Sequence, residues 1–165
     1  MSTDDPAYRD PLGIHARHLL TCRTLWYDWQ RPEAGFGVAG ICTHVEPPDG
    51  ATFPQVFSRF FVYFQLWGDP GEYRLRLRLV RLPGEGDTGE EIHLGEDGEP
   101  LEFPAPDKPP ITVLVSGLDF VEEYALPIGP VPFPKSGVYE YQLWIEGGDE
   151  PIAREQVLAR GVNDE

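Results

Sequence analysis

Five cysteine and histidine side chains near the start of the chain have the clearest capacity for chemistry. They are His15, His18, Cys22, Cys42 and His44. Thiolate and imidazole are the ligands that zinc takes in tetrahedral sites. The two segments that hold the cysteines are expected to form a hairpin, which would place Cys22 nearly opposite Cys42. Because the ligand spacing differs from that of structural zinc sites, and free cysteine is usually buried, we expect two reduced, buried thiols, with a metal site and a disulfide as the alternatives.

A glycine-rich run at residues 84–89 has the spacing of a dinucleotide-binding loop, G-x-G-x-x-G. Such a loop must be followed by a helix whose amino terminus faces the phosphates. Here a strand pattern follows, and Glu85 and Asp87 would repel phosphate groups. We therefore interpret the run as a surface loop.

Calcium binding and nucleophilic catalysis find little support in the sequence. Acidic loops at 85–91, 96–99 and 146–150 lack the regular spacing of a calcium loop, so we expect them to be solvated. None of the four serines lies in the G-x-S-x-G sequence of a nucleophile elbow; they are Ser2, Ser58, Ser116 and Ser136. The sequence therefore predicts a protein that is not an enzyme and that carries no cofactor or metal.

Three arginines on one strand form the first candidate binding site, here called the arginine row. Arg74, Arg76 and Arg78 alternate with leucines, so they project from one face of the strand expected at 72–82. The row could bind an anion or an acidic partner. The alternative is pairing across strands with carboxylates such as those of Glu122 or Glu140. In that case we expect a solvent-facing row, in which charge reversal at Arg76 changes stability only modestly.

Aromatic side chains form the second candidate binding surface. Phe61, Tyr63 and Trp67 share one face of the strand expected at 59–67. The other face carries Phe60, Val62, Phe64 and Leu66, and one of the two faces must be the core. Trp144 falls out of phase with the apolar residues of its own strand and is expected to face outward. Exposed aromatic clusters mark interaction surfaces, and the alternative is that the proline-rich segments cover them.

Alternation of polar and apolar residues predicts the elements that position these side chains. Residues 72–80 and 137–146 repeat with a period of two, which is typical of half-buried strands. Their core sides are expected to carry Leu75, Leu77 and Leu79 on the first strand, and Tyr139, Tyr141 and Leu143 on the second. Further strands are expected at 17–27, 36–46, 59–67, 91–94, 111–115, 119–126 and 151–159, with a helical turn as the alternative for the last of these. Prolines predict a stiff crossing segment at 104–110 and a turn at 127–135.

These eight or nine short strands predict an all-β fold. The arrangement expected is a two-sheet antiparallel β-sandwich of about eight strands, immunoglobulin-like or jelly-roll-like. The 165 residues, with 18 glycines and 18 prolines, suit one domain with many tight turns. We expect a flexible arm at 1–16, the sandwich at 17–160 and a short tail at 161–165.

Charge limits the partners of the chain. The formal net charge is −15, which repels nucleic-acid backbones, so we expect no nucleic-acid partner. The first residues, Met1 to Pro6, are acidic where a secretion signal needs a basic region, and no apolar run is long enough to cross a membrane. We therefore expect a cytoplasmic protein without a membrane partner.

Several segments resemble an uncharacterised bacterial family of small β-sandwich proteins. The segments are Leu19-Leu20-Thr21-Cys22, Gly37 to Ile41, Phe53-Pro54, Gly71 to Leu77, and Ser136 to Leu143. The resemblance covers most of residues 18–158 and implies a sandwich fold without an assigned activity. We expect a non-catalytic binding or assembly module that contacts a protein partner or another copy of itself. The alternatives are a metal-binding protein that uses the cysteine and histidine end of the first hairpin, and a structural subunit of a larger assembly.

Overall fold

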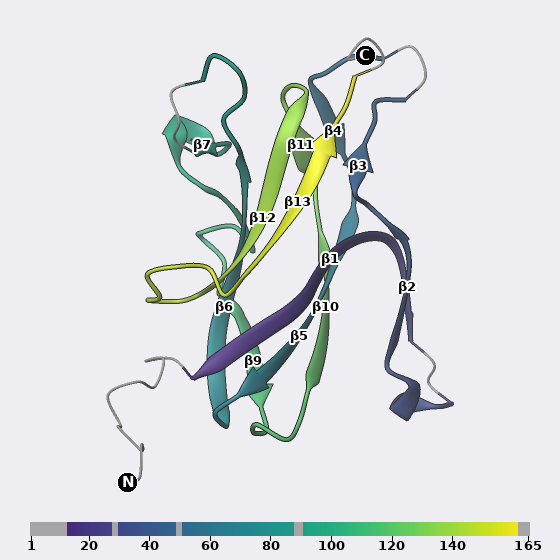
Figure 1. Cartoon of the computed structure of the whole chain (residues 1–165), viewed down its shortest axis with the longest axis vertical. Helices are drawn as coiled ribbons and strands as arrows, with labels where there is room; N and C mark the ends of the chain where they lie inside the picture. Colours follow the sequence, from purple (N-terminus) through teal and green to yellow (C-terminus); the bar gives the residue numbers. More distant parts are fainter. Residues whose placement is uncertain (1–12, 28–29, 49–50, 88–90, 162–165) are drawn as a thin grey trace, which may run out of the picture.

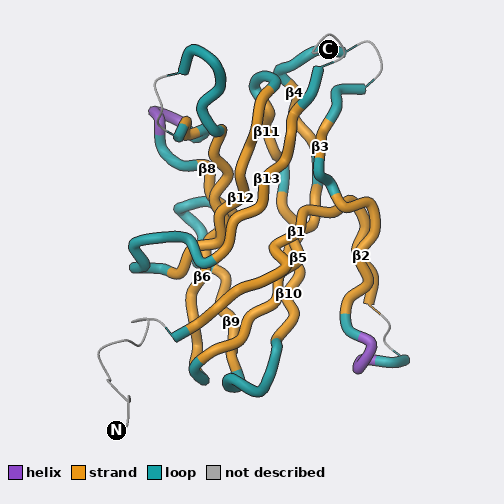
Figure 2. Tube along the Cα trace, viewed as in Figure 1, coloured by secondary structure: helices purple, strands orange, loops and turns teal. Residues whose placement is uncertain are grey.

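The computed structural model describes residues 13–27, 30–48, 51–87 and 91–161, and these parts are built almost entirely of β-strands (Figures 1 and 2). Two short 3-10 helices, η2 (Pro32–Ala34) and η3 (Glu96–Gly98), are the helical turns of the described chain. The prediction of an all-β protein is confirmed. None of the helices in these ranges is long and apolar enough to cross a membrane. Most of the expected arm and tail, residues 1–12 and 162–165, lies outside the described residues.

Four antiparallel strands form sheet A, in the order β10-β5-β1-β2. They are β1 (Ile14–Tyr27), β2 (Phe36–Ile41), β5 (Phe60–Gly68) and β10 (Glu122–Ile128). The first part of β1 pairs with β5, and its last part pairs with β2. The register with β5 shifts at a bulge where His18 has a φ of 51°. Beyond this bulge β1 arches over, and the β1–β2 hairpin projects from one side of the molecule (Figure 1).

Seven strands form sheet B. Its main path contains β3 (His44–Val45), β13 (Ala153–Ala159), β12 (Gly137–Ile145) and β6 (Gly71–Arg81). The far edge of β6 pairs in succession with β9 (Ile111–Val115), β8 (Leu101–Phe103) and β7 (Ile92–His93). A two-stranded sheet C joins β4 (Gln55–Phe57) to β11 (Val131–Phe133).

The strand arrangement differs from the predicted one in number and direction. The described chain contains thirteen strands in three sheets, and β13 pairs with β3 in parallel, so the sheets are mixed. The segment expected as one strand at 36–46 breaks after Ile41, next to Gly40 with its φ of 63°, and its end joins sheet B as β3. β4, β8 and β11 were not predicted because three residues beside a proline show no periodicity.

Two predicted boundaries were also wrong. The first strand begins at Ile14, so the expected arm at 1–16 was too long: Ile14 is buried and pairs with Gly68. The segment 127–135, expected as a turn, holds the end of β10 and all of β11. Prolines are tolerated there because these strands are short or lie at sheet edges.

One buried core contains side chains from all three sheets. Leu75, Leu77 and Leu79 are fully buried on β6, as are Tyr139, Tyr141 and Leu143 on β12, so both predicted core faces are confirmed. Sheet A contributes the face of β5 that carries Phe60, Val62, Phe64 and Leu66. β5 lies between β10 and β1, which agrees with the apolar residues on both of its faces.

Candidate protein-interaction surface

The arginine row lies on the outer side of β6, opposite the buried leucines, as the alternation predicted. Two of its members share one carboxylate: the Nε of Arg78 lies 2.7 Å from Oε1 of Glu102, and the Nε of Arg76 lies 3.8 Å from its Oε2. Arg74 pairs with Glu146 at 3.0 Å, and both of these side chains are exposed. The partners named from the sequence, Glu122 and Glu140, were wrong. Glu102 belongs to β8, which was not predicted.

Arg76 holds the proline-rich loop, residues 104–110, against sheet B. Its Nη1 donates to the carbonyl oxygens of Pro104 at 3.1 Å and Ala105 at 3.2 Å, and its Nη2 donates to that of Lys108 at 3.0 Å. The side chain of Arg76 is only 16% exposed and that of Glu102 only 10%. The expectation of a solvent-facing row is therefore wrong at Arg76, because the loop folds over it.

A polar network continues from the arginine row across β12. The guanidinium carbon of Arg78 lies 4.3 Å from the ring centre of Trp144, whose indole N–H donates to Oε1 of Gln142 at 3.1 Å. Gln142 in turn donates to Oε1 of Glu140 at 2.9 Å, and Arg154 donates to the same oxygen at 2.8 Å. Trp144 therefore faces the outer side of sheet B, as expected, but it is half-buried within this network.

Glu140 has hydrogen-bond partners from three side chains of this network. Burial acts to raise its pKa, but hydrogen bonds from Gln142, Arg154 and Gln156 together hold the pKa of Glu140 below its usual range. The outer side of sheet B thus supplies partners for its own charges.

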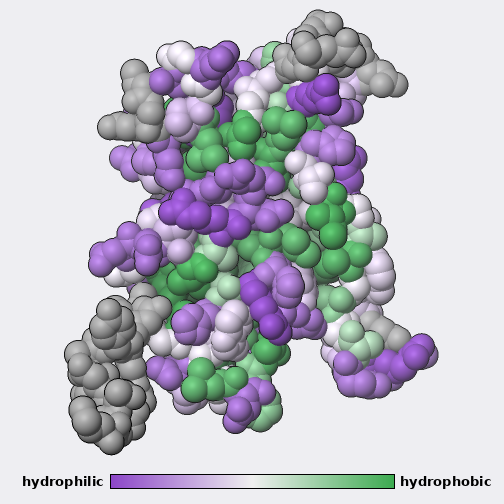
Figure 3. Space-filling model, viewed as in Figure 1, coloured by the Kyte–Doolittle hydropathy of each residue, from purple (hydrophilic) through white to green (hydrophobic). Residues whose placement is uncertain are grey.

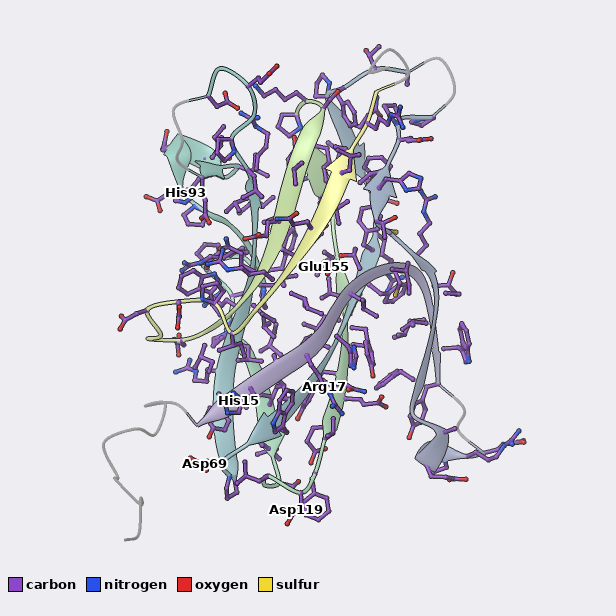
Figure 4. The ribbon with its side chains drawn as sticks, viewed as in Figure 1. His15, Arg17, Asp69, His93, Asp119 and Glu155 are labelled. Atoms are coloured by element: carbon purple, nitrogen blue, oxygen red, sulfur yellow. The ribbon has the colours of Figure 1, made fainter. Side chains whose placement is uncertain are left out.

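The three aromatic residues of β5 lie on sheet A and are not brought together with Trp144. The ring of Trp67 packs against His15 at 5.6 Å and under Arg17 at 5.3 Å. Both of these partners lie on β1 and are labelled in Figure 4. Phe61 lies under the guanidinium of Arg59 at 5.0 Å. Tyr63 is buried, and its hydroxyl donates to Oε1 of Glu123 at 2.5 Å. Burial, followed by that hydrogen bond, raises the pKa of Tyr63 to about 12.

Glu123 also fixes the start of β2. The backbone N–H of Phe36 donates to Oε2 of Glu123 at 3.3 Å. The preceding Gly35 has a φ of 70°, and a Cβ atom there would collide with the same carboxylate. A side chain of β10 therefore holds the β1–β2 hairpin in place.

The free edge of β2 is the surface that sequence reasoning missed. Within the described chain β2 pairs only with β1, and its six residues, Phe36 to Ile41, carry no charge. Two large apolar side chains of the hairpin are exposed, Trp26 at 54% and Ile41 at 49%. Figure 3 shows apolar surface over this side of the molecule. The available signal was the uncharged run at residues 34–43, which contains β2, in a chain with 25% charged residues.

The opposite edge of sheet A is protected. β10 carries Glu122, Glu123 and Pro127, which disfavour the addition of another strand. The hydroxyl of Tyr124 donates to the carbonyl oxygen of Leu114 at 2.6 Å and accepts the N–H of the same residue at 3.0 Å. β10 is thereby tied to β9 of sheet B.

The cysteines and histidines do not form a metal centre in the described ranges. Cys22 and Cys42 are both buried, as predicted, and neither is in a disulfide. Burial raises the pKa of both thiols. In residues 13–27, 30–48, 51–87 and 91–161, no three side chains of the His, Cys, Asp or Glu type lie close enough together to hold a metal ion.

The surface of the described residues includes two clefts. One, of about 570 Å³, lies between Trp67, the start of β1 and the β12–β13 loop at 147–152. The other, of about 400 Å³, lies between β8 and β10 and is lined mainly by apolar residues and prolines. Glu102 is the charged residue of this second cleft, and its carboxylate is already paired with two arginines.

Comparison with known proteins assigns no family. No family model and no curated protein matches the chain. Among solved structures, part of the Pseudomonas fluorescens alkylpurine DNA glycosylase AlkC, bound to DNA containing an abasic site analog, has a TM-score of 0.46 and 8% identity, over 90% of this chain and 30% of that one. The Bifidobacterium adolescentis GH3 beta-glucosidase has a TM-score of 0.42 and 8% identity, over 88% of this chain and 17% of that one. Beta-glucosidase 3B from Thermotoga neapolitana, in complex with glycerol, has a TM-score of 0.34 and 14% identity, over 65% and 15%.

This chain therefore spans less than a third of each of those proteins. Similarities this distant carry no argument about activity. The resemblance to an uncharacterised bacterial family stays a prediction.

Proposed function

We propose that this chain is a non-catalytic protein-binding module of the cytoplasm that accepts an extended partner strand along the free edge of β2. Its scaffold would be an immunoglobulin-like or jelly-roll-like sandwich of sheets A and B. The core that the sheets share supports this scaffold. Two neighbouring cysteines without a disulfide fit a reducing compartment.

One observation carries the proposal: β2 has neither the charged side chains nor the prolines that usually keep edge strands from pairing. Natural edge strands are usually blocked by charged side chains, prolines, bulges or a covering loop. β2 has six uncharged residues without proline, and in the described chain no other strand pairs with its outer edge. About half of the backbone groups of such an edge point away from its one neighbour, and strand addition satisfies them.

The polar residues of the molecule support a scaffold rather than a catalytic role. The arginine row, Trp144 and Tyr63 are all engaged with neighbouring side chains or backbone groups. The net charge of −15 supports a protein partner over a nucleic acid. The metal-binding alternative has no convergent ligand set among the described residues to support it.

A charge placed on the edge tests the proposal. Ile41→Lys adds an ammonium group to the free edge of β2 at a side chain that is already half exposed. Leu114→Lys is the matched control, since it makes the same type of change at a 63% exposed side chain of β9. Each protein is used to capture partners from extracts of the native host, and hydrogen exchange of β2 is measured in the purified complex.

We expect Ile41→Lys to lose the partner, Leu114→Lys to retain it, and the amides of β2 to become protected in the complex. A partner that both variants retain, or a complex in which β2 exchanges as fast as in the free protein, would contradict the proposal.

A further inference from the structure

We propose that the strand which pairs with β2 is β2 of a second copy of this chain, related by a two-fold axis. This inference rests on the proposed function and names its partner. Two antiparallel copies of one strand are related by a two-fold axis perpendicular to the sheet, so each copy presents the same surface to the other. The result would be a continuous sheet with the order β5-β1-β2 followed by the same strands of the second copy in reverse.

The distribution of charge favours a second copy at this place. Residues 20–42 contain two basic and two acidic residues, Arg23, Arg31, Asp28 and Glu33, so the hairpin segment is neutral. The whole net charge of −15 therefore belongs to the rest of the chain, where two copies repel one another. The hairpin is therefore a part of the molecule that two copies can bring together with little repulsion from its own charges.

The residues of β2 suit antiparallel pairing with themselves. With Val38 on the two-fold axis, Phe36 lies opposite Gly40, and Gly37 lies opposite Ala39. The largest residue, Phe36, thus faces a glycine, and no like charges face each other. An aromatic side chain opposite a glycine also covers the backbone that the glycine leaves exposed.

Exposed apolar side chains of the hairpin lie on one face, beside the proposed interface. Trp26 is opposite Gly37, and Ile41 is opposite Cys22, so both side chains are on the same face of the hairpin. A Cβ atom at residue 37 would collide with the indole of Trp26, so the indole lies over Gly37 on β2. An axis perpendicular to the sheet brings the same face of both copies together. The indole of each copy would then lie near β2 of the other, and the exposed part of Trp26 would become covered.

The size of the contact sets the expected affinity. Pairing of two six-residue strands, with cover from Trp26 and Ile41, falls at or below the lower end of stable interfaces, about 1,200 Å². The hydrogen bond from Phe36 to Glu123 holds the hairpin in position before association, which reduces the ordering that binding requires. We expect a reversible dimer with a dissociation constant of about 1–100 μM.

Sedimentation velocity of the full chain, from about 1 μM to about 1 mM, tests the inference. We expect a monomer–dimer equilibrium that becomes stronger with added salt, because salt screens the repulsion between two acidic copies. Val38→Lys should weaken dimerisation at least about tenfold, because two ammonium groups meet near the axis. A mixture of Val38→Lys with Val38→Glu should restore it as a heterodimer. Leu114→Lys should dimerise like the wild type, and circular dichroism checks that every variant is folded.

Three outcomes would overturn the inference: a monomer over the whole range, dimerisation that Val38→Lys leaves unchanged, or failure of the mixture to associate when both variants are folded. Failure of the proposed function is distinguishable. If the wild type stays monomeric but Ile41→Lys still loses a partner from the host, β2 binds a strand of another protein. If both experiments fail, the edge of β2 is not a binding surface.

Discussion

The outer side of sheet B and the free edge of β2 differ in whether their polar groups have partners within the chain. On sheet B, Arg76 alone donates to three carbonyl oxygens, and Glu140 accepts hydrogen bonds from three side chains. The edge of β2 has no charged side chain, and no strand of the described chain pairs with it. The charged surface of sheet B is therefore already paired within the chain. The uncharged edge of β2 is the one that remains available to another strand.

Charge in a sequence therefore does not by itself mark a binding site. A row of arginines attracts attention, but its partners can come from a neighbouring strand and a loop of the same chain. An unpaired strand edge consists of backbone groups, so no particular type of side chain identifies it in the sequence. It becomes visible only when the order of the strands is known.

The largest effect is expected at the inner side of β6, on the strand that carries the arginine row. Leu77 is fully buried in the core that the sheets share. Leu77→Ala should lower the free energy of unfolding by about 2–5 kcal/mol, through lost burial and the cavity left behind. Urea denaturation measures this. A loss below about 0.5 kcal/mol would show that the inner side of β6 does not hold the sheets together.

Substitutions at two members of the arginine row should have an intermediate effect on the free energy of unfolding, and the two can be compared directly. Arg76→Ala removes the donor to three carbonyl oxygens and should cost about 1–3 kcal/mol, more than the modest effect expected from the sequence. Arg74→Ala removes only an exposed pair, with a side chain that is 57% exposed, and should cost about 0–1 kcal/mol. The same denaturation experiment measures both. Equal, small effects would mean that the row does not stabilise the fold and is available to an anionic partner.

Two carboxylates on neighbouring strands should respond to pH in opposite directions. Glu140, on the outer side of β12, has a lowered pKa in the folded state, so its contribution to stability is present above its unfolded pKa and is lost as the pH falls through the lowered value. Glu155, on β13 (Figure 4), has a pKa raised by burial, so the folded state binds its proton more readily than the unfolded state. Stability therefore falls as the pH rises from the unfolded pKa of Glu155 through its raised value.

Amide variants at these positions test that contrast. At about pH 7, Glu155→Gln should raise the melting temperature and Glu140→Gln should lower it. Both differences should shrink as the pH is lowered through the pKa of the glutamate concerned. Shifts of the same sign at neutral pH would show that the two carboxylates do not differ as their surroundings suggest.

The smallest effect on stability is expected at the edge of β2. The side chain of Ile41 is half exposed, so Ile41→Lys should change the free energy of unfolding by less than about 0.5 kcal/mol in dilute solution. Denaturation at low protein concentration measures this. A loss of about 2 kcal/mol or more would show that Ile41 supports the hairpin itself, and the edge would then be part of the folded core.

Much of the core could be predicted from the sequence, and much of the surface could not. Alternation placed Leu77 and Tyr141 correctly, because a slip of one residue would expose the whole apolar face. The three-residue strand β8 was missed, and with it Glu102, the carboxylate that Arg76 and Arg78 share. The segment that follows β2 leaves sheet A and pairs with β13 as β3, which a continuous strand pattern over 36–46 does not reveal. The exposure of β2 depends on strand order, which is a property of the whole fold.

Hydrogen exchange of wild-type protein at two concentrations tests the open edge of β2 most directly. The peptide that covers residues 36–41 should exchange faster at about 1 μM than at about 1 mM, because pairing with a second copy protects β2 at the higher concentration. The peptide that covers residues 137–145, in the middle of sheet B, should exchange equally slowly at both concentrations and serves as the internal control. Protection of residues 36–41 that is the same at both concentrations would contradict the account.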